Sequence, residues 1–251
     1  MRALVGERDE RAVQSSAAAL QSELHHRAAT ISSMAVLSSG DLTFEEIFAT
    51  TNDLAMDFNG GIAFLDSDGR LLANTNNKSF WDSVSQNAQG ISLASSSDPE
   101  PVFSAPILDP NSKQRFVIIS AYSAPHNVIV AGAFSPETLA AEILSATYPT
   151  GSHVTIYLVD ESRRALFVSG ALAQDSLEPD HPGVAEALRG ESGVLYVKKE
   201  STEHVVAYSP IEPTGWALIT EEEWEMVISP SLQLTQMAPL VLVPAFILAL
   251  I

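Results

Sequence analysis

The sequence predicts an α+β protein in which a long N-terminal helix is followed by two similar units, each an antiparallel sheet with flanking helices. Between Val13 and Ala35, apolar residues recur at intervals of three and four, which places them on one stripe of a helix. Two patterns of strand, turn and strand follow, over residues 62–74 and 154–170, and Asp68-Gly69 in the first is typical of a hairpin turn. Strands that neighbour one another along the chain, with helices between the pairs, indicate α+β architecture.

The two units are predicted to be copies of one design. Each hairpin is followed by a second pair of strands that carries Ala-Tyr-Ser, at 121–123 and at 207–209, and then by a helix, at 136–146 and 221–228. The period is roughly 90 residues, which is too long for a solenoid repeat and suits a small domain. The shared order of elements carries more weight than the short identical strings.

Domain boundaries follow from these patterns. Residues 1–40 are expected to form the long helix, 41–147 the first unit, 148–229 the second unit and 230–251 the start of a membrane helix. Gly40-Asp41 ends the first helix, and a further helix is expected over 43–58. The long helix packs either on its own domain or on a second copy of itself, and both alternatives stay open.

The C-terminal residues 237–251 form an uncharged apolar run that is shorter than the 20 or so residues of a membrane span. A buried helix or strand is one interpretation. Pro239 and Pro244 favour the other, an incomplete membrane helix, because membrane helices tolerate proline better than soluble core helices. Charged residues crowd the first eleven positions, so no signal peptide is expected there.

Composition excludes several classes of function. A formal net charge of −18 disfavours nucleic acid and other polyanionic partners. The chain has no cysteine, which excludes a disulfide framework, Cys-ligated zinc and a thiol nucleophile. Its six histidines show no metal-binding spacing and are expected to be solvated or capping residues, while the acidic run 221–223 is expected to start a helix. We therefore expect neither an enzyme nor a cofactor.

Two segments of the second unit carry a resemblance to a known family. They read DHPGVAEALRGESGVLYV at 180–197 and VVAYSPIEPTGWALITEEEWEMV at 205–227, and the first unit adds IAFLDSDGRLLAN and Ser-Ala-Pro at 104–106. The chain resembles the double Cache domains of bacterial chemoreceptors and sensor histidine kinases, which consist of two tandem PAS-like units. The resemblance implies an extracytoplasmic sensor at the bacterial cell membrane, flanked by two membrane helices, with the first unit distal to the membrane.

The resemblance also implies where a ligand binds. Amino-acid-sensing members use an Arg-x-aromatic-aromatic segment in the distal unit, and the nearest counterpart here is Lys78-Ser79-Phe80-Trp81. The Asp that holds the ligand amine is replaced by Ala133, and an expected Tyr by Ile107. A small carboxylate or an uncharged solute is therefore expected rather than a free amino acid. The candidate ligand-binding residues are Lys78, Phe80, Trp81, Ser104, Ser120 and Tyr122.

Core packing is an equal alternative for Phe80 and Trp81, and it is the expected role of Tyr208 and Trp216. Ser120 and Tyr122 are two residues apart on one strand, so they share a face. The first unit is favoured as the ligand site because its insertion at 75–103 is rich in Ser, Asn and Gln and contains an aromatic pair. The expected function is sensing of a small solute in this unit, relayed through the second unit to the membrane. The alternative is a structural or protein-binding ectodomain without a small ligand.

Deletion of residues 232–251 tests the interpretation of the C-terminal run. The melting temperature should stay within about two degrees and solubility should improve, because an exposed apolar segment has been removed. Differential scanning fluorimetry and the yield of soluble protein provide the measurement. A large loss of stability would mean that the run belongs to the core.

Overall fold

The computed structural model describes residues 2–38, 40–98, 100–149, 151–170, 178, 180–199 and 201–227. It divides into two compact parts, a first unit of Ala18–Leu144 and a second unit of Met1–Ala17 with Ser145–Ile251. The predicted membrane segment at 230–251 lies outside the described residues. None of the helices in the described part of the chain has both the length and the hydropathy that crossing a bilayer requires.

The long N-terminal helix is α1, Arg2–Leu37, and its buried stripe includes Val13, Leu20, Leu24 and Ile31, as the periodicity predicts. The helix begins eleven residues before the first residue of this stripe, and in that stretch Gly6 and Asp9, which are not large apolar residues, occupy buried positions. Its first part clusters with the second unit and its remainder with the first.

The first unit is built on one antiparallel sheet, and the predicted hairpin at 62–74 is confirmed as two paired strands. The strand order is β2-β1-β6-β5-β3, and the short β4 also pairs with β5. The strands are β1 (Gly61–Asp66), β2 (Leu71–Asn74), β3 (Val102–Phe103), β4 (Ile107–Leu108), β5 (Arg115–Ser123) and β6 (Val128–Phe134).

The helices of this unit depart from the sequence prediction at two places. They are α2 (Phe44–Thr50), η1 (Leu54–Asp57), α3 (Lys78–Gln86), η2 (Ala88–Gly90) and α4 (Pro136–Leu144). The single helix predicted over 43–58 is wrong: the Thr50 and Thr51 hydroxyls donate to carbonyls four residues back, and the helix ends there. The insertion at 75–103, expected as a polar loop, contains α3, whose inner face carries Phe80, Trp81 and Val84.

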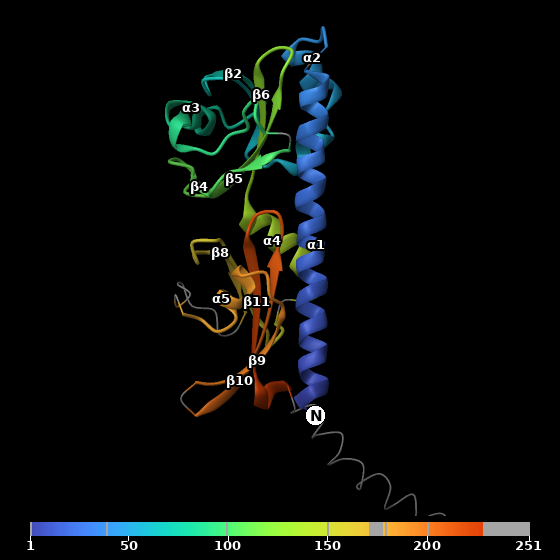
Figure 1. Cartoon of the computed structure of the whole chain (residues 1–251), viewed down its shortest axis with the longest axis vertical. Helices are drawn as coiled ribbons and strands as arrows, with labels where there is room; N and C mark the ends of the chain where they lie inside the picture. Colours follow the sequence, from blue (N-terminus) through green and yellow to red (C-terminus); the bar gives the residue numbers. More distant parts are fainter. Residues whose placement is uncertain are drawn as a thin grey trace, which may run out of the picture. The chain divides into compact units, whose positions relative to one another are not determined.

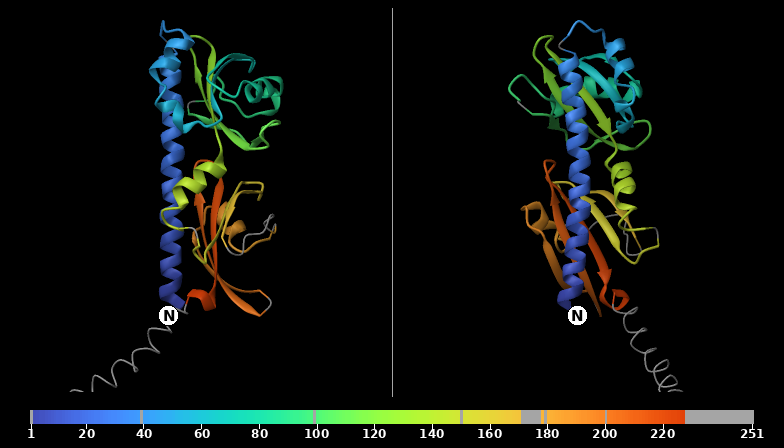
Figure 2. Two further views of the ribbon diagram at one scale, coloured as in Figure 1. Left: turned by 180° about the vertical axis from the view of Figure 1, so that it is seen from behind. Right: turned by 90° about the vertical axis from the view of Figure 1, so that its right-hand side faces the viewer.

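Both faces of the first unit's sheet are covered, as Figures 1 and 2 show, with α1 on one face and α3 on the other. Residues of β6 alternate accordingly. Ala131 and Ala133 pack in the core cluster of α3, while Gly132 faces α1 and Phe58. A Cβ on Gly132 would lie 2.5 Å from the Phe58 ring and 2.7 Å from Ile31, so α1 and the segment around Phe58 approach the sheet closely.

The second unit repeats the first. Its strand order is β8-β7-β11-β10-β9, and each strand has its counterpart in the first unit at the same place in the order. This confirms an α+β fold of two tandem antiparallel units. The elements are β7 (Thr155–Val159), β8 (Ala165–Ser169), α5 (Val184–Leu188), β9 (Gly193–Lys199), β10 (Thr202–Ile211) and β11 (Trp216–Glu223).

The acidic run 221–223 does not begin a helix, so that expectation is wrong. It forms the end of β11, where Glu221 pairs with Val206 on one side and Thr155 on the other, and a helical turn follows only at 224–227. Basic side chains from other elements surround Glu221 and allow a carboxylate inside the sheet. Tyr208 and Trp216 are buried, which confirms their predicted place in the core.

Replacement of Gly132 tests the close approach of α1 to the first unit's sheet. Gly132→Ala should lower the free energy of unfolding by about 1–3 kcal/mol, because the added methyl overlaps Phe58 and Ile31. Gly90→Ala is the matched control, since a Cβ at Gly90 meets nothing within 4 Å. Urea unfolding followed by circular dichroism compares them. Equal stability of the two variants would contradict the packing.

Candidate ligand-binding site

The predicted aromatic pair lies inside the core of the first unit. Phe80 and Trp81 are both 0% exposed on the inner face of α3, with their rings edge to face at 5.3 Å. The indole Nε1 of Trp81 donates a hydrogen bond of 3.1 Å to the carbonyl of Gly60, just before β1. This bond satisfies the one polar atom of the ring and fixes α3 against the sheet.

Lys78 begins α3 and points to solvent, with its side chain 74% exposed. Its ammonium lies 3.1 Å from Asp82, one turn later on the same helix. Such an exposed pair contributes little stability. Lys78 is thus near the aromatic pair in sequence but lies outside the buried face of the helix.

Ser104 and Ser120 use their hydroxyls to hold backbone segments. Ser104 Oγ accepts from the Ile118 amide at 2.9 Å, and Ser120 Oγ accepts from the Ala94 amide at 2.8 Å. Both serines are buried. The Ser120 bond fastens the segment after η2 to the middle of β5.

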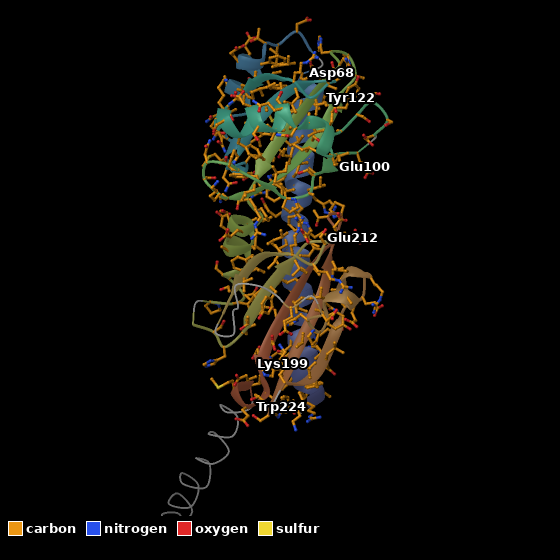
Figure 3. The ribbon with its side chains drawn as sticks, turned by 90° about the vertical axis from the view of Figure 1, so that its left-hand side faces the viewer. Asp68, Glu100, Tyr122, Lys199, Glu212 and Trp224 are labelled. Carbon is orange, nitrogen blue, oxygen red and sulfur yellow. The ribbon has the colours of Figure 1, made fainter. Side chains whose placement is uncertain are left out.

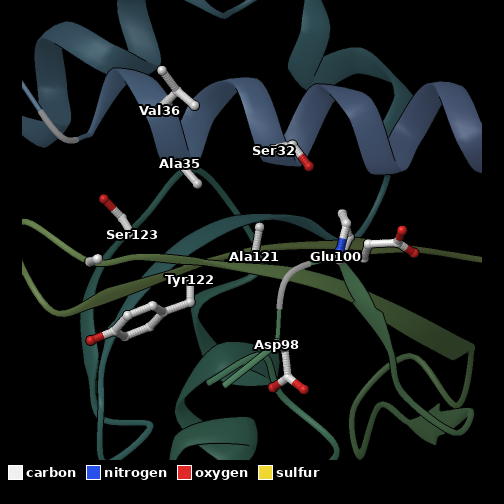
Figure 4. A pocket seen from close by; sticks show the side chains of 10 residues that line it. Ser32, Ala35, Val36, Asp98, Glu100, Ala121, Tyr122 and Ser123 are labelled. Atoms are coloured by element: carbon white, nitrogen blue, oxygen red, sulfur yellow. The ribbon is translucent and has the colours of Figure 1, made fainter. Parts of the chain in front are cut away.

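Tyr122 is one of the six predicted residues and lies near the end of β5. It lines a cavity of about 230 Å³. We call it the edge cavity; its wall also includes Val36 of α1, Asp98 and Glu100 (Figure 4). The Tyr122 hydroxyl donates to Asn127 Oδ1 at 2.6 Å, and Asn127 Nδ2 donates to Ser67 Oγ at 2.9 Å. This chain of bonds links Tyr122 to the turn between β1 and β2.

A larger open cavity, about 970 Å³ in volume, lies on the α3 side of the same unit. We call it the α3 cavity; its wall consists of the β1–β2 turn (67–70), the end of α3 with η2 (85–91), residues 93–95 and Ile129 of β6. Its size is within the range of small-molecule sites. Gly69 allows the turn to approach η2, since it has a φ of +79° and a Cβ there would overlap Ala88.

The wall of the α3 cavity is polar and has no net charge. Asp68 and Arg70 are its charged residues, and Arg70 Nη1 lies 3.4 Å from Asp68 Oδ2. In the view of Figure 3, Asp68 lies near Tyr122 on one side of the first unit. The remaining polar groups are hydroxyls and amides, which both donate and accept hydrogen bonds: Ser67, Ser85, Gln86, Asn87, Gln89 and Ser95.

The individual residues of the α3 cavity were missed by sequence reasoning, although two signals pointed to it. The hairpin turn at Asp68-Gly69 was predicted, and so was the insertion rich in Ser, Asn and Gln. The prediction chose Phe80 and Trp81 on α3, but the inner face of this helix belongs to the core. The polar residues that follow α3 line the open space.

No family model and no curated protein matches the sequence. Solved structures do match: the sensory domain of the Campylobacter jejuni chemoreceptor Tlp3 with isoleucine bound has a TM-score of 0.62 at 10% identity, over 88% of this chain and 93% of that one. The ligand-binding domain of the Pseudomonas fluorescens chemoreceptor CtaA with L-serine has a TM-score of 0.61 at 16% identity, over 89% and 99%.

A third match is the ligand-binding domain of the Pseudomonas aeruginosa PAO1 amino acid chemoreceptor PctB with L-Gln, at a TM-score of 0.55 and 12% identity over 88% of this chain and 91% of that one. All three likenesses extend over both units. The chain has the double Cache fold. The predicted resemblance is thereby confirmed at the level of the fold.

The second unit of this double Cache fold contains a buried charge cluster. Glu221 is 1% exposed, and its Oε2 lies 3.0 Å from His181 Nε2 while its Oε1 lies 2.7 Å from Lys199 Nζ. His204 Nδ1 is 3.0 Å from Oε1 but lies outside hydrogen-bond geometry. The expectation of solvated or capping histidines is therefore wrong for His181 and His204.

The basic neighbours decide the charge of Glu221. Burial raises the pKa of this carboxyl, but hydrogen bonds and charges of His181 and Lys199 outweigh the effect and lower the pKa from 4.5 to about 2. Glu221 is ionised at neutral pH. The network could not be predicted locally, because its members come from β9, β10, β11 and the segment before α5.

Acid should destabilise the protein through Glu221. Its folded-state pKa lies below 4.5, so its stabilising contribution is complete above pH 4.5 and is lost as the pH falls from 4.5 toward 2. A shift of this size corresponds to about 3 kcal/mol. Glu221→Gln should be less stable at pH 7 and should show a flatter acid dependence in urea unfolding from pH 7 to pH 2.5.

Glu161→Gln is the control for this measurement, because Glu161 is an exposed carboxylate of the same unit. It should follow the wild-type curve. The charge network is refuted if Glu221→Gln keeps the wild-type acid dependence.

Proposed function

We propose that the chain is the extracytoplasmic ligand-sensing domain of a bacterial transmembrane receptor, and that a small solute binds in the first unit. The observation that carries the proposal is the α3 cavity of about 970 Å³, found in a chain that shares its fold with chemoreceptor ligand-binding domains. The cavity wall combines apolar side chains, which include Ile91, Leu93 and Ile129, with hydroxyl and amide groups. Binding sites of this kind bury the body of a solute and orient it by a few polar groups.

The lining favours an uncharged polar solute. A free amino acid needs a cation for its carboxylate and an anion for its amine. In the described part of the cavity wall the two charged side chains, Asp68 and Arg70, are 69% and 74% exposed, so neither offers a buried charge to an amino acid. Ala133, where amino-acid-sensing members carry an Asp, is fully buried. A small carboxylate is the second choice, because it would have to compete with Asp68 for Arg70.

Five of the six residues predicted from sequence keep a place in this proposal, and Lys78, which is exposed and pairs with Asp82, does not. Tyr122 reaches the rim of the α3 cavity through Asn127 and Ser67. Ser120 holds Ala94, a residue of the cavity wall. Phe80 and Trp81 set the position of α3 and so of the residues that follow it, while Ser104 fixes the strand pair behind.

The signal is proposed to leave along α1 and through the second unit to the membrane. α1 is one continuous helix that clusters partly with each unit, so a displacement at one part of it is transmitted to the other. Membrane helices on both sides of the domain belong to the proposal, as does a homodimer through α1. The outward positions of α1 include small residues such as Ala18, Ala29 and Ser33, which would permit close contact with a second copy.

Thermal-shift measurements test the ligand and its class. Glycerol and D-ribose serve as uncharged probes, succinate as a carboxylate, and L-serine and L-isoleucine as amino acids. A solute at 100 times its Kd stabilises the folded state by about 2.7 kcal/mol, which corresponds to a rise of several degrees in melting temperature. We expect stabilisation by uncharged probes.

Variants locate the site once a probe binds. Gln89→Ala, on the cavity wall, should weaken binding up to about tenfold. Tyr122→Ala, which acts through Asn127 and Ser67, should weaken binding by less than Gln89→Ala, while Gln14→Ala on the exposed face of α1 should have no effect. Trp81→Ala requires circular dichroism beside titration calorimetry, since its indole is part of the core.

The outcomes separate the alternatives. Stabilisation by amino acids alone would overturn the proposed ligand class. Failure of a broad metabolite library to stabilise the protein would favour the rival function, a structural or protein-binding ectodomain. Unchanged binding in both Tyr122→Ala and Gln89→Ala would place the site elsewhere.

A further inference from the structure

The buried cluster of the second unit contains a histidine whose two ring nitrogens both face acceptors. His181 Nε2 lies 3.0 Å from Glu221 Oε2, and His181 Nδ1 lies 3.0 Å from the carbonyl oxygen of Pro182. Carboxylate and carbonyl oxygens accept hydrogen bonds and cannot donate them. Both contacts are satisfied together only when each ring nitrogen carries a proton.

The groups that face His181 carry charges of both signs, and Glu221, which favours the extra proton, is in direct contact with the ring. Glu221 on β11 is a carboxylate, Lys199 from β9 contributes one positive charge, and His204 from β10 lies beside the same carboxylate. Tyr157 on β7 packs its ring 5.0 Å from the imidazole. Burial, with the charges of Glu221 and Glu178, raises the pKa of Tyr157 to about 12, so this hydroxyl stays neutral.

Loss of the proton has a defined location. Glu221 remains an acceptor throughout the neutral range, so the proton on Nε2 stays in place, and the proton that leaves is the one on Nδ1. The bare Nδ1 then faces the Pro182 oxygen, and two lone pairs oppose each other across a contact that was a hydrogen bond. A rearrangement of the turn at 181–183 would relieve this contact.

The rearrangement would reach α5. The turn leads directly into this helix through Gly183, which has a φ of +84° and lies so near the Tyr208 ring that a Cβ would be 2.9 Å from it. Val184 and Ala187 of α5 are buried in the core cluster with Tyr208 and Ile219. The turn is therefore tied to the helix, and a rearrangement of the turn would displace α5.

We propose that His181 is a proton-binding site through which the second unit responds to the pH around it, with the protonated ring holding α5 against the sheet and the neutral ring releasing it. The proton is then a second stimulus, separate from the solute proposed for the first unit. The site requires no residue of the α3 cavity.

NMR of the 251-residue chain, labelled with ¹⁵N, tests the proposal between pH 5 and pH 8, the range in which histidine charge commonly changes. At the acid end both ring nitrogens of His181 should be protonated, and with rising pH the Nδ1 proton alone should be lost. The backbone amides of 183–188 should shift with the same midpoint. In His181→Gln, which keeps a donor toward Glu221 but cannot titrate, this shift of the amides should be lost.

Two further variants serve as controls. His25→Gln removes an exposed histidine of α1 and should leave the titration of the α5 amides unchanged. His204→Gln should also leave it in place, because His204 makes no hydrogen bond to Glu221 through Nδ1. The proposal would be overturned if the pH-dependent shift of the α5 amides is lost in His204→Gln, or if it persists in His181→Gln.

The wild-type spectrum is decisive by itself if His181→Gln does not fold. A His181 ring with one bare nitrogen at pH 5 contradicts the proton site. A protonated ring whose titration leaves the amides of 183–188 unmoved contradicts the release of α5.

Discussion

Burial of both faces of each sheet is the constraint on which the structure depends. β6 is buried along its whole length, and β7 likewise, so neither strand can show the alternation of an exposed sheet. Each sheet needs a cover on both sides, and α1 supplies one cover in each unit. Because α1 approaches β6 closely at Gly132, the geometry of this face leaves little room for change. The opposite face is covered by shorter pieces of chain, and there the two units differ.

The difference lies in how the second cover is held. In the first unit, α3 and the residues after it are fixed by neutral groups: the indole of Trp81 bonds to a carbonyl, and Ser85 and Ser120 bond to amides. In the second unit an ionic network centred on Glu221 takes that place. Neutral hydrogen bonds change little with pH, whereas a buried carboxylate with basic partners is sensitive to it. The two similar units thus hold the second cover of their sheets by different interactions, neutral hydrogen bonds in the first unit and an ionic network in the second.

The fold was predictable from sequence because its signals are periodic and local. The stripe of α1, the turn at Asp68-Gly69 and the succession of strands and helices along the chain are all readable within short windows. The missed features depend on distant partners. The run 221–223 resembles a helix start until His181 and Lys199 are known to lie beside it. Thr50 and Thr51 end α2 through their own hydroxyls, a competition that apolar periodicity does not register.

The candidate site was harder to predict for the same reason. The sequence identifies Phe80 and Trp81 as unusual in a polar insertion, but the choice between core and pocket depends on which way α3 faces the sheet. The structure turns that face inward. The polar residues beyond Gln86 then become the open wall, although no single one of them is distinctive in sequence.

The attachment of the α3 cavity wall has a consequence for selectivity. Ser85 Oγ accepts from the Leu71 amide, and Ser120 Oγ accepts from the Ala94 amide, so the stretch between Ser85 and Ala94 is clamped at both ends. Within it, Gly90 has no atom within 4 Å of where a Cβ would be. Ile91 and Leu93 of this stretch pack against the core, whereas Gln86, Asn87 and Gln89 line the cavity. Exchange of these polar side chains alone would change which solute is recognised, while the scaffold that carries the signal stays the same.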